Sequence, residues 1–167
     1  MKLKKILGLA LAASVLALPV SAQDRMLRAA PGAPPAHPAN GVLYANFAEY
    51  LVEESDGRLG AVILGPEVAN LLQMKDSLQS QVIEVGNLLP LYYPAELPNM
   101  ALAGELLLVP QNSQAAAAAM TEFIVTCEPC QQEMRALGLV YLGSGASDVF
   151  EIISTEPVRT AADLEGM

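Results

Sequence analysis

The sequence predicts an α/β fold with a largely parallel sheet flanked by helices. Three apolar runs of strand length, at 26–30, 59–64 and 82–89, alternate with two stretches whose apolar residues recur every three or four positions. Strands that alternate with helices in this way are typical of βαβ units, whose crossovers are right-handed. Ligands of such sheets bind at the carboxyl ends of the strands. The loops expected at those ends are 31–38, 65–67 and 90–98.

The first half of the chain is expected to supply the three strands and two helices. A proline-rich loop at 31–35 follows the first strand, because proline fixes φ and lacks the N–H that a sheet ladder needs. Asn40 is expected to cap the first helix. The apolar positions of this helix are Leu43, Phe47, Tyr50 and Leu51. The chain then turns at 56–57 into the second strand, and a second helix is predicted over 68–79.

The second half of the chain is predicted to be mainly helical. A short apolar stretch at 106–109 precedes a helix that Asn112 or Ser113 caps and that continues through the alanine run at 115–119 to Thr126. A further helix is expected over 131–137, with Gly138 at the position of a left-handed C-cap. An extended stretch at 139–142, a turn at 143–147 and a strand at 149–154 would follow.

The first 22 residues have the pattern of a secretory signal peptide. Lys2, Lys4 and Lys5 precede an apolar run at 6–18, and the small residues at 19–22 form a cleavage site before Gln23. A retained anchor is the alternative, but the apolar run is shorter than the roughly 20 residues that span a bilayer. We therefore expect export, cleavage after Ala22 and no membrane insertion of the mature chain.

The charge of the mature chain argues against a nucleic-acid partner. The whole sequence has nine basic and 18 acidic residues, and three of the basic ones lie in the signal peptide. The remainder carries a formal net charge of −12, whereas binding to phosphate backbones needs clustered lysine and arginine.

The segment Cys127-Glu128-Pro129-Cys130 precedes a predicted helix and admits two interpretations. An exported thiol-disulfide oxidoreductase would use a C-x-x-C motif at a helix N-terminus, where the pKa of the first thiol is lowered. Two cysteines this close in an exported protein more often form a structural disulfide. The residues before Cys127 are expected to be helical, whereas such a redox motif follows a strand. The sequence therefore favours the structural disulfide.

Five segments carry a resemblance to one family of transport receptors. The segment 157–167 matches the pattern Pro-Val-x-Thr-x-x-Asp-Leu-x-Gly-[Leu/Met]. Weaker matches are the loop 31–40, the turn 55–59, the stretch 78–86 and the loop around Tyr92 and Tyr93. In their order and spacing these segments resemble the substrate-binding proteins of TRAP transporters, the DctP-like family of periplasmic solute receptors.

The resemblance implies a non-enzymatic receptor without a cofactor. Two α/β lobes of the periplasmic-binding-protein type would close over a small organic acid, with C4-dicarboxylates as the family default, and deliver it to TRAP membrane permease subunits. The expected organisation is a signal peptide at 1–22, the N-terminal lobe at 23–154 and the start of the crossover into a second lobe at 155–167. The second lobe would be mostly absent, together with the arginine that follows this motif in the family and grips the ligand carboxylate, so we expect weak binding.

The candidate ligand-binding residues are His37, Asn70, Tyr92, Tyr93 and Phe150. The single histidine lies in the first strand-end loop, and the tyrosine pair lies in the third, where a ring with a hydroxyl tip can both pack and donate. The alternatives are a surface role for His37, helix capping for Asn70 and core packing for the tyrosines. Phe150 stands where sialic-acid-type members place an arginine, which argues against a sugar acid. One histidine lacks the co-ligands of a metal site.

Overall fold

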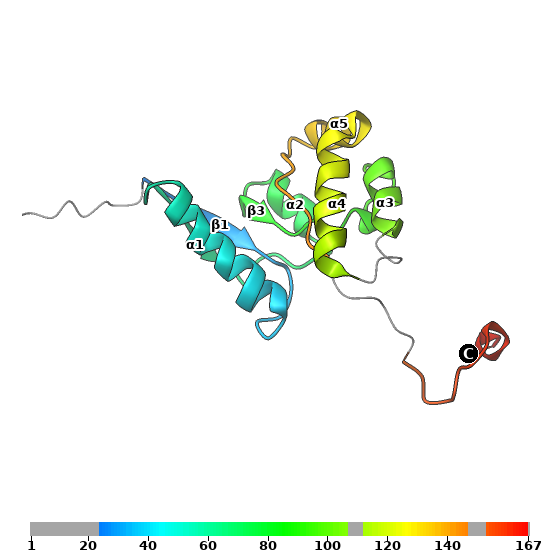
Figure 1. Cartoon of the computed structure of the whole chain (residues 1–167). Helices are drawn as coiled ribbons and strands as arrows, with labels where there is room; N and C mark the ends of the chain where they lie inside the picture. The colour runs from blue at the N-terminus through cyan, green and yellow to red at the C-terminus, as the bar shows by residue number, and fades with distance from the viewer. Residues whose placement is uncertain (1–23, 107–111, 147–152, 167) are drawn as a thin grey trace, which may run out of the picture.

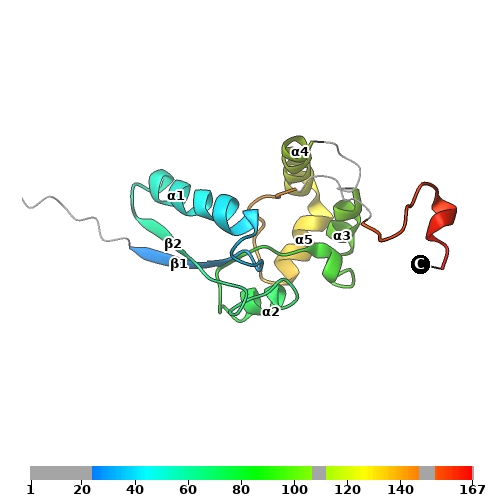
Figure 2. The same ribbon diagram turned by 90° about the horizontal axis from the view of Figure 1, so that it is seen from below.

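The computed structural model describes residues 24–106, 112–146 and 153–166 and confirms the α/β fold (Figure 1). The central strand β1 (Arg25–Ala30) pairs in parallel with β2 (Leu59–Ile63) on one side and with β3 (Val85–Gly86) on the other. The chain therefore moves from β1 to β2 and then back past β1 to β3. Right-handed crossovers in opposite directions require their helices on opposite faces, and α1 (Ala45–Glu54) and α2 (Met74–Gln79) do lie on either side of the sheet (Figure 2).

The first helix begins differently from the prediction. A π-helical segment, η1 (Ala39–Tyr44), runs directly into α1, and Asn40 does not cap it. The Asn40 side-chain amide instead donates to the carbonyls of Ala33 and Pro34, at 2.7 and 2.8 Å, and so holds the proline-rich loop. A π-helical segment has a longer period than an α-helix. The buried position therefore moves from Leu43, which is 51% exposed, to Tyr44, which is 7% exposed.

The predicted second helix and third strand are both shorter than expected. Helix α2 starts only at Met74, because residues 68–73 form turns in which the Asn70 carboxamide oxygen accepts from the N–H groups of Leu72 and Gln73. Strand β3 contains two residues. The N–H groups of Val82 and Ile83 bond to the Ser77 carbonyl at the end of α2 and are not available to a ladder.

Gln81 adopts the left-handed conformation, with φ of 58°, in the turn between α2 and β3. The turn therefore has left-handed geometry at a residue with a side chain, where glycine would be less strained. The Gln81 carbonyl accepts a hydrogen bond of 2.8 Å from the Arg28 guanidinium, which stabilises this turn against β1.

Three helices form the second body of the structure. Helix α3 (Pro98–Glu105) was not predicted from the sequence, although proline at a first helical position is a known start signal. Asn112, one of the two predicted capping residues, caps helix α4 (Ser113–Thr126), and its side chain accepts from the Ala115 N–H at 2.9 Å. Helix α5 (Glu128–Ala136) follows almost immediately and ends before Gly138, which has φ of 72° as the predicted left-handed cap requires.

Two hydrophobic clusters join the helices and the sheet. Ala30, Ala69, Met74 and Ile83 are buried between the sheet and α2. The larger cluster lies among α3, α4 and α5 and contains Tyr93, Leu97, Met100, Ala103, Met120, Ile124, Cys130 and Met134. Leu88, just after β3, packs against both clusters and so connects them.

The last described segment, 153–166, lies apart from this body and contains the short 3-10 helix η4 (Ala161–Leu164) (Figures 1 and 2). Thr160 and Asp163 form a capping box at its start. The apolar stretch predicted at 106–109 and the strand predicted at 149–154 lie largely outside the described residues. Among the helices that are described, none has both the length and the apolar character needed to cross a bilayer.

Replacing Gln81 with glycine is expected to stabilise the protein by about 0.5–1 kcal/mol. A side chain in the left-handed region costs roughly 1–2 kcal/mol, and the greater freedom of glycine in the unfolded chain offsets part of that gain. Urea unfolding would measure the difference. Gln79→Gly, in the last turn of α2, is the control and should destabilise by about 1–2 kcal/mol, because it lowers helix propensity and removes the hydrogen bond from the Gln79 amide to the Leu137 carbonyl. Destabilisation by both variants would contradict the assignment of strain to residue 81.

Candidate functional site

A cavity of about 660 Å³ lies beside β3. One wall comes from the start of the first helix, at Tyr44 and Phe47, and another from β3 with its flanking residues 83–90. The stretch 138–145, which follows α5, forms a third wall, and helices α3 to α5 contribute Met100, Met120, Ile124 and Met134. The cavity thus includes residues 87–90, which follow the carboxyl end of β3, the end at which ligands of parallel sheets bind, and it also touches Arg25 at the start of β1.

The lining of this cavity is mainly apolar. Leucine, methionine, isoleucine, valine and aromatic side chains provide most of it, and methionine side chains adapt to ligands of irregular shape. The polar members among the described residues are Arg25, Gln81, Glu84, Asn87, Tyr44, Tyr141 and Ser144. Small-molecule sites commonly combine an apolar wall with a few polar groups and have volumes of roughly 300–1,000 Å³. Size and composition therefore suit a small organic ligand.

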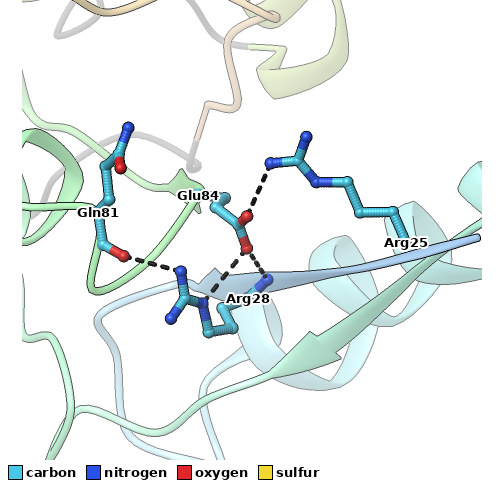
Figure 3. A network of polar contacts seen from close by, with 4 residues as sticks. All are labelled: Arg25, Arg28, Gln81 and Glu84. Atoms are coloured by element: carbon cyan, nitrogen blue, oxygen red, sulfur yellow. Dashed lines mark hydrogen bonds and ion pairs between the residues drawn. The ribbon is translucent and has the colours of Figure 1, made fainter.

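Glu84 holds two arginines of β1 at one end of the cavity (Figure 3). Its carboxylate accepts from the Arg25 guanidinium at 2.9 Å, from the Arg28 backbone N–H at 2.8 Å and from Arg28 Nε at 3.3 Å. The backbone N–H of Arg28 and then the guanidinium of Arg25 lower the pKa of Glu84 to about 2. Glu84 is therefore ionised at any physiological pH.

This network leaves little cationic character for a ligand. Arg25 is the one basic residue among the described residues that line the cavity, and its guanidinium is paired with Glu84. Arg28 is paired with the same carboxylate and with the Gln81 carbonyl. A ligand carboxylate in the cavity would meet a nearly neutral wall, so hydrogen bonding and apolar packing are its main sources of affinity.

The structure does not bring the predicted ligand residues together. His37 is exposed, and its Nδ1 accepts from the Ala39 N–H at 3.1 Å, so its ring forms a local contact at the surface. Asn70 is engaged in the turn before α2, and its amide also donates to Gln73 Oε1. Neither residue lines the cavity. Phe150 lies outside the described residues.

The two tyrosines have different positions, and neither lines the cavity. Tyr92 is half exposed. Tyr93 is buried in the larger cluster, and its hydroxyl donates to the Leu72 carbonyl at 3.1 Å and accepts from the Lys75 N–H at 3.4 Å. The Lys75 ammonium lies 5.2 Å from its ring centroid and pairs with Glu96 at 2.7 Å. Tyr93 therefore packs in the core and attaches the third loop to α2, which is the role given above as the alternative to ligand binding.

Cys127 and Cys130 are joined by a disulfide at the junction of α4 and α5. Cys130 is fully buried in the larger cluster, and Cys127 is partly buried. The residues before Cys127 belong to α4, as expected, and not to a strand. Ile124 and Met134, on either side of the disulfide, both line the cavity. The bond therefore constrains the corner that supplies part of the cavity wall.

Sequence reasoning missed the residues that do line the site, above all Tyr44, Asn87 and Tyr141. Asn87 was within reach of prediction, since it is a polar residue near the end of the third apolar run, 82–89. Tyr44 carried no such signal, because the helical period placed Leu43 on the buried face. Among the described residues, no group of three or more histidine, cysteine or acidic side chains could hold a metal.

The fold is similar to that of solved TRAP solute-binding proteins. One is a marine metagenome protein specific for aromatic acid ligands, in complex with 3-hydroxybenzoate, with a TM-score of 0.56 and 17% identity. Another comes from Rhodoferax ferrireducens T118 and holds copurified benzoate, with a TM-score of 0.52 and 16% identity. The chain has the fold of one part of these proteins.

The coverage of these matches is unequal. They include 68% and 62% of this chain but only 35% and 33% of the solved chains, so this chain spans about a third of their length. The marine protein also matches as a surface mutant in complex with metahydroxyphenylacetate, with a TM-score of 0.54, 17% identity, and 66% of this chain and 34% of that one covered. No protein-family model and no curated protein matches the sequence.

The Glu84 network should make stability fall at acid pH. Because the pKa of Glu84 is lowered from 4.5 to about 2, its stabilisation is complete above pH 4.5 and is lost as the pH falls towards 2. Urea unfolding of the wild type and Glu84→Gln should therefore show a stability difference that shrinks over this range. Glu122→Gln, an exposed glutamate of α4 outside the network, controls for the loss of charge. A Glu84→Gln difference that stays constant with pH would contradict the network.

Removal of the disulfide should destabilise the fold by a modest amount. A bond between residues three positions apart closes a short loop, for which the loss of chain entropy predicts about 2 kcal/mol. Urea unfolding with and without a reductant would measure it, and the Cys127→Ala/Cys130→Ala variant should be insensitive to the reductant. A loss of 4 kcal/mol or more, on the order of a long-loop disulfide, would show that the entropic account is incomplete.

The same reagents test the oxidoreductase alternative. Because Cys130 is fully buried, we expect no turnover in an insulin-reduction assay. Turnover that disappears in Cys127→Ser would favour the enzyme.

Proposed function

We propose that this protein is a periplasmic substrate-binding component of a TRAP-type transporter that captures a small organic acid. The sequence segments that resemble the family and the fold likeness to three solved TRAP solute-binding structures support this function independently. In this proposal, residues 23–154 form the N-terminal lobe, and 155–167 begin the crossover into a second lobe. TRAP membrane permease subunits would receive the ligand.

The single observation that carries the proposal is the apolar cavity at the carboxyl end of β3, within a fold shared with acid receptors. Its position agrees with the rule for parallel sheets, and its volume suits a small organic molecule. Binding would shift the receptor towards its closed form only through ligand contacts that the closed form makes and the open form does not.

The cavity favours an aromatic acid over a C4-dicarboxylate. A dicarboxylate has two charged ends, and each would need its own donors or cation, whereas the one basic residue of the described lining is already paired with Glu84. An aromatic ring would pack against the methionine, isoleucine and phenylalanine side chains. The solved proteins to which this fold is similar hold 3-hydroxybenzoate, metahydroxyphenylacetate and benzoate.

The test is an NMR titration of the purified, ¹⁵N-labelled chain with benzoate, 3-hydroxybenzoate and succinate. We expect saturable shifts at the lining residues for the aromatic acids and smaller or no shifts for succinate. Affinity should be weaker than micromolar, because the chain spans about a third of the length of the solved receptors. His37 and Tyr92, which lie outside the cavity, are internal controls. Shifts that do not saturate, or that spread over the surface, would refute a site in the cavity.

A further inference from the structure

Tyr44 is a buried polar residue on the wall of the cavity. It is the last residue of η1, only 7% of its surface is exposed, and its ring lies 6.3 Å from that of Phe47, which also lines the cavity. No described residue hydrogen-bonds to its hydroxyl, and no side-chain oxygen or nitrogen of the described residues is both fully enclosed and unpaired, so this hydroxyl is accessible. Tyr93, which is equally buried, satisfies its hydroxyl with backbone groups of residues 71, 72 and 75. The Tyr44 hydroxyl is therefore accessible to a hydrogen-bond acceptor in the cavity that Tyr44 lines.

The other polar side chains of the lining have less capacity to bind an anion. The Arg25 guanidinium is paired with Glu84, and the hydroxyls of Tyr141 and Ser144 bond to each other. Gln81 is exposed and Asn87 is only partly buried, so water can satisfy their amides. Burial raises the pKa of the Tyr44 hydroxyl above its ordinary value, so it remains a proton donor at physiological pH.

We propose that the Tyr44 hydroxyl donates a hydrogen bond to the carboxylate of the acid in the cavity and is a specificity-determining residue of the site. The inference rests on the proposed function. The π-helical segment places Tyr44 next to Leu43 on the cavity wall and buries Tyr44, whereas Leu43 stays half exposed. A neutral donor in an apolar pocket binds a carboxylate without leaving a buried cation unpaired when the site is empty.

The test compares benzoate binding to the wild type and Tyr44→Phe by the same NMR titration. Loss of one hydrogen bond should raise the Kd about three- to tenfold, because the net free energy of a single hydrogen bond changes a binding constant by about this factor. Tyr92→Phe, which removes a hydroxyl outside the cavity, should leave the Kd unchanged. Toluene lacks an acceptor, so its affinity should be the same for the wild type and Tyr44→Phe.

The outcomes separate this inference from the proposed function. Equal benzoate affinities of wild type and Tyr44→Phe would overturn the role of Tyr44 and leave the receptor function intact. Equal losses for benzoate and toluene would also overturn it, since they would reveal a change in packing. Absence of saturable benzoate binding to the wild type would overturn both. A loss confined to benzoate and to Tyr44→Phe would establish the hydrogen bond.

Discussion

The packing of Met74 beneath the carboxyl ends of β1 and β3 is the constraint on which the rest of the structure depends. Met74 and Ala30 have no exposed surface, and Ala30 pairs with Gly86 across the ladder. A Cβ on Gly86 would lie 2.4 Å from Met74 Sδ, so any side chain there would displace the methionine. Small residues at these two strand ends therefore allow α2 to approach the sheet.

Electrostatic contacts also hold the start of β3 against β1. Glu84 accepts from the backbone and side chain of Arg28 and from Arg25, so the residue that precedes β3 is attached to β1 along its length. The network pairs both arginines with one carboxylate, which offsets one of their two positive charges.

The cavity lies where the sheet and the helical body meet. Leu88 packs against both hydrophobic clusters, and the disulfide constrains the α4–α5 corner that supplies Ile124 and Met134. A substitution that changed the packing between the two bodies would change the cavity directly, because each contributes part of its wall.

The sequence by itself determined the α/β class and the parallel direction of the strands, because these depend on periodicity. It also determined a helix cap at residue 112 or 113 and the left-handed cap at Gly138, because these depend on local hydrogen bonds and backbone geometry. Tertiary structure decided which residues form the site. The π-helical start of the first helix buried Tyr44 and left Leu43 half exposed, although both line the cavity. The Ser77 carbonyl shortened the third strand by accepting from Val82 and Ile83.

His37, Asn70, Tyr92 and Tyr93 were chosen because they lie in or near the strand-end loops, but none of them lines the cavity. Its walls come from segments far apart in the chain, 43–47, 83–90 and 138–145 among them. Local patterns carry no information about such distant contacts. Only the packed structure could therefore show that Tyr44 is buried beside a cavity with its hydroxyl available to a ligand.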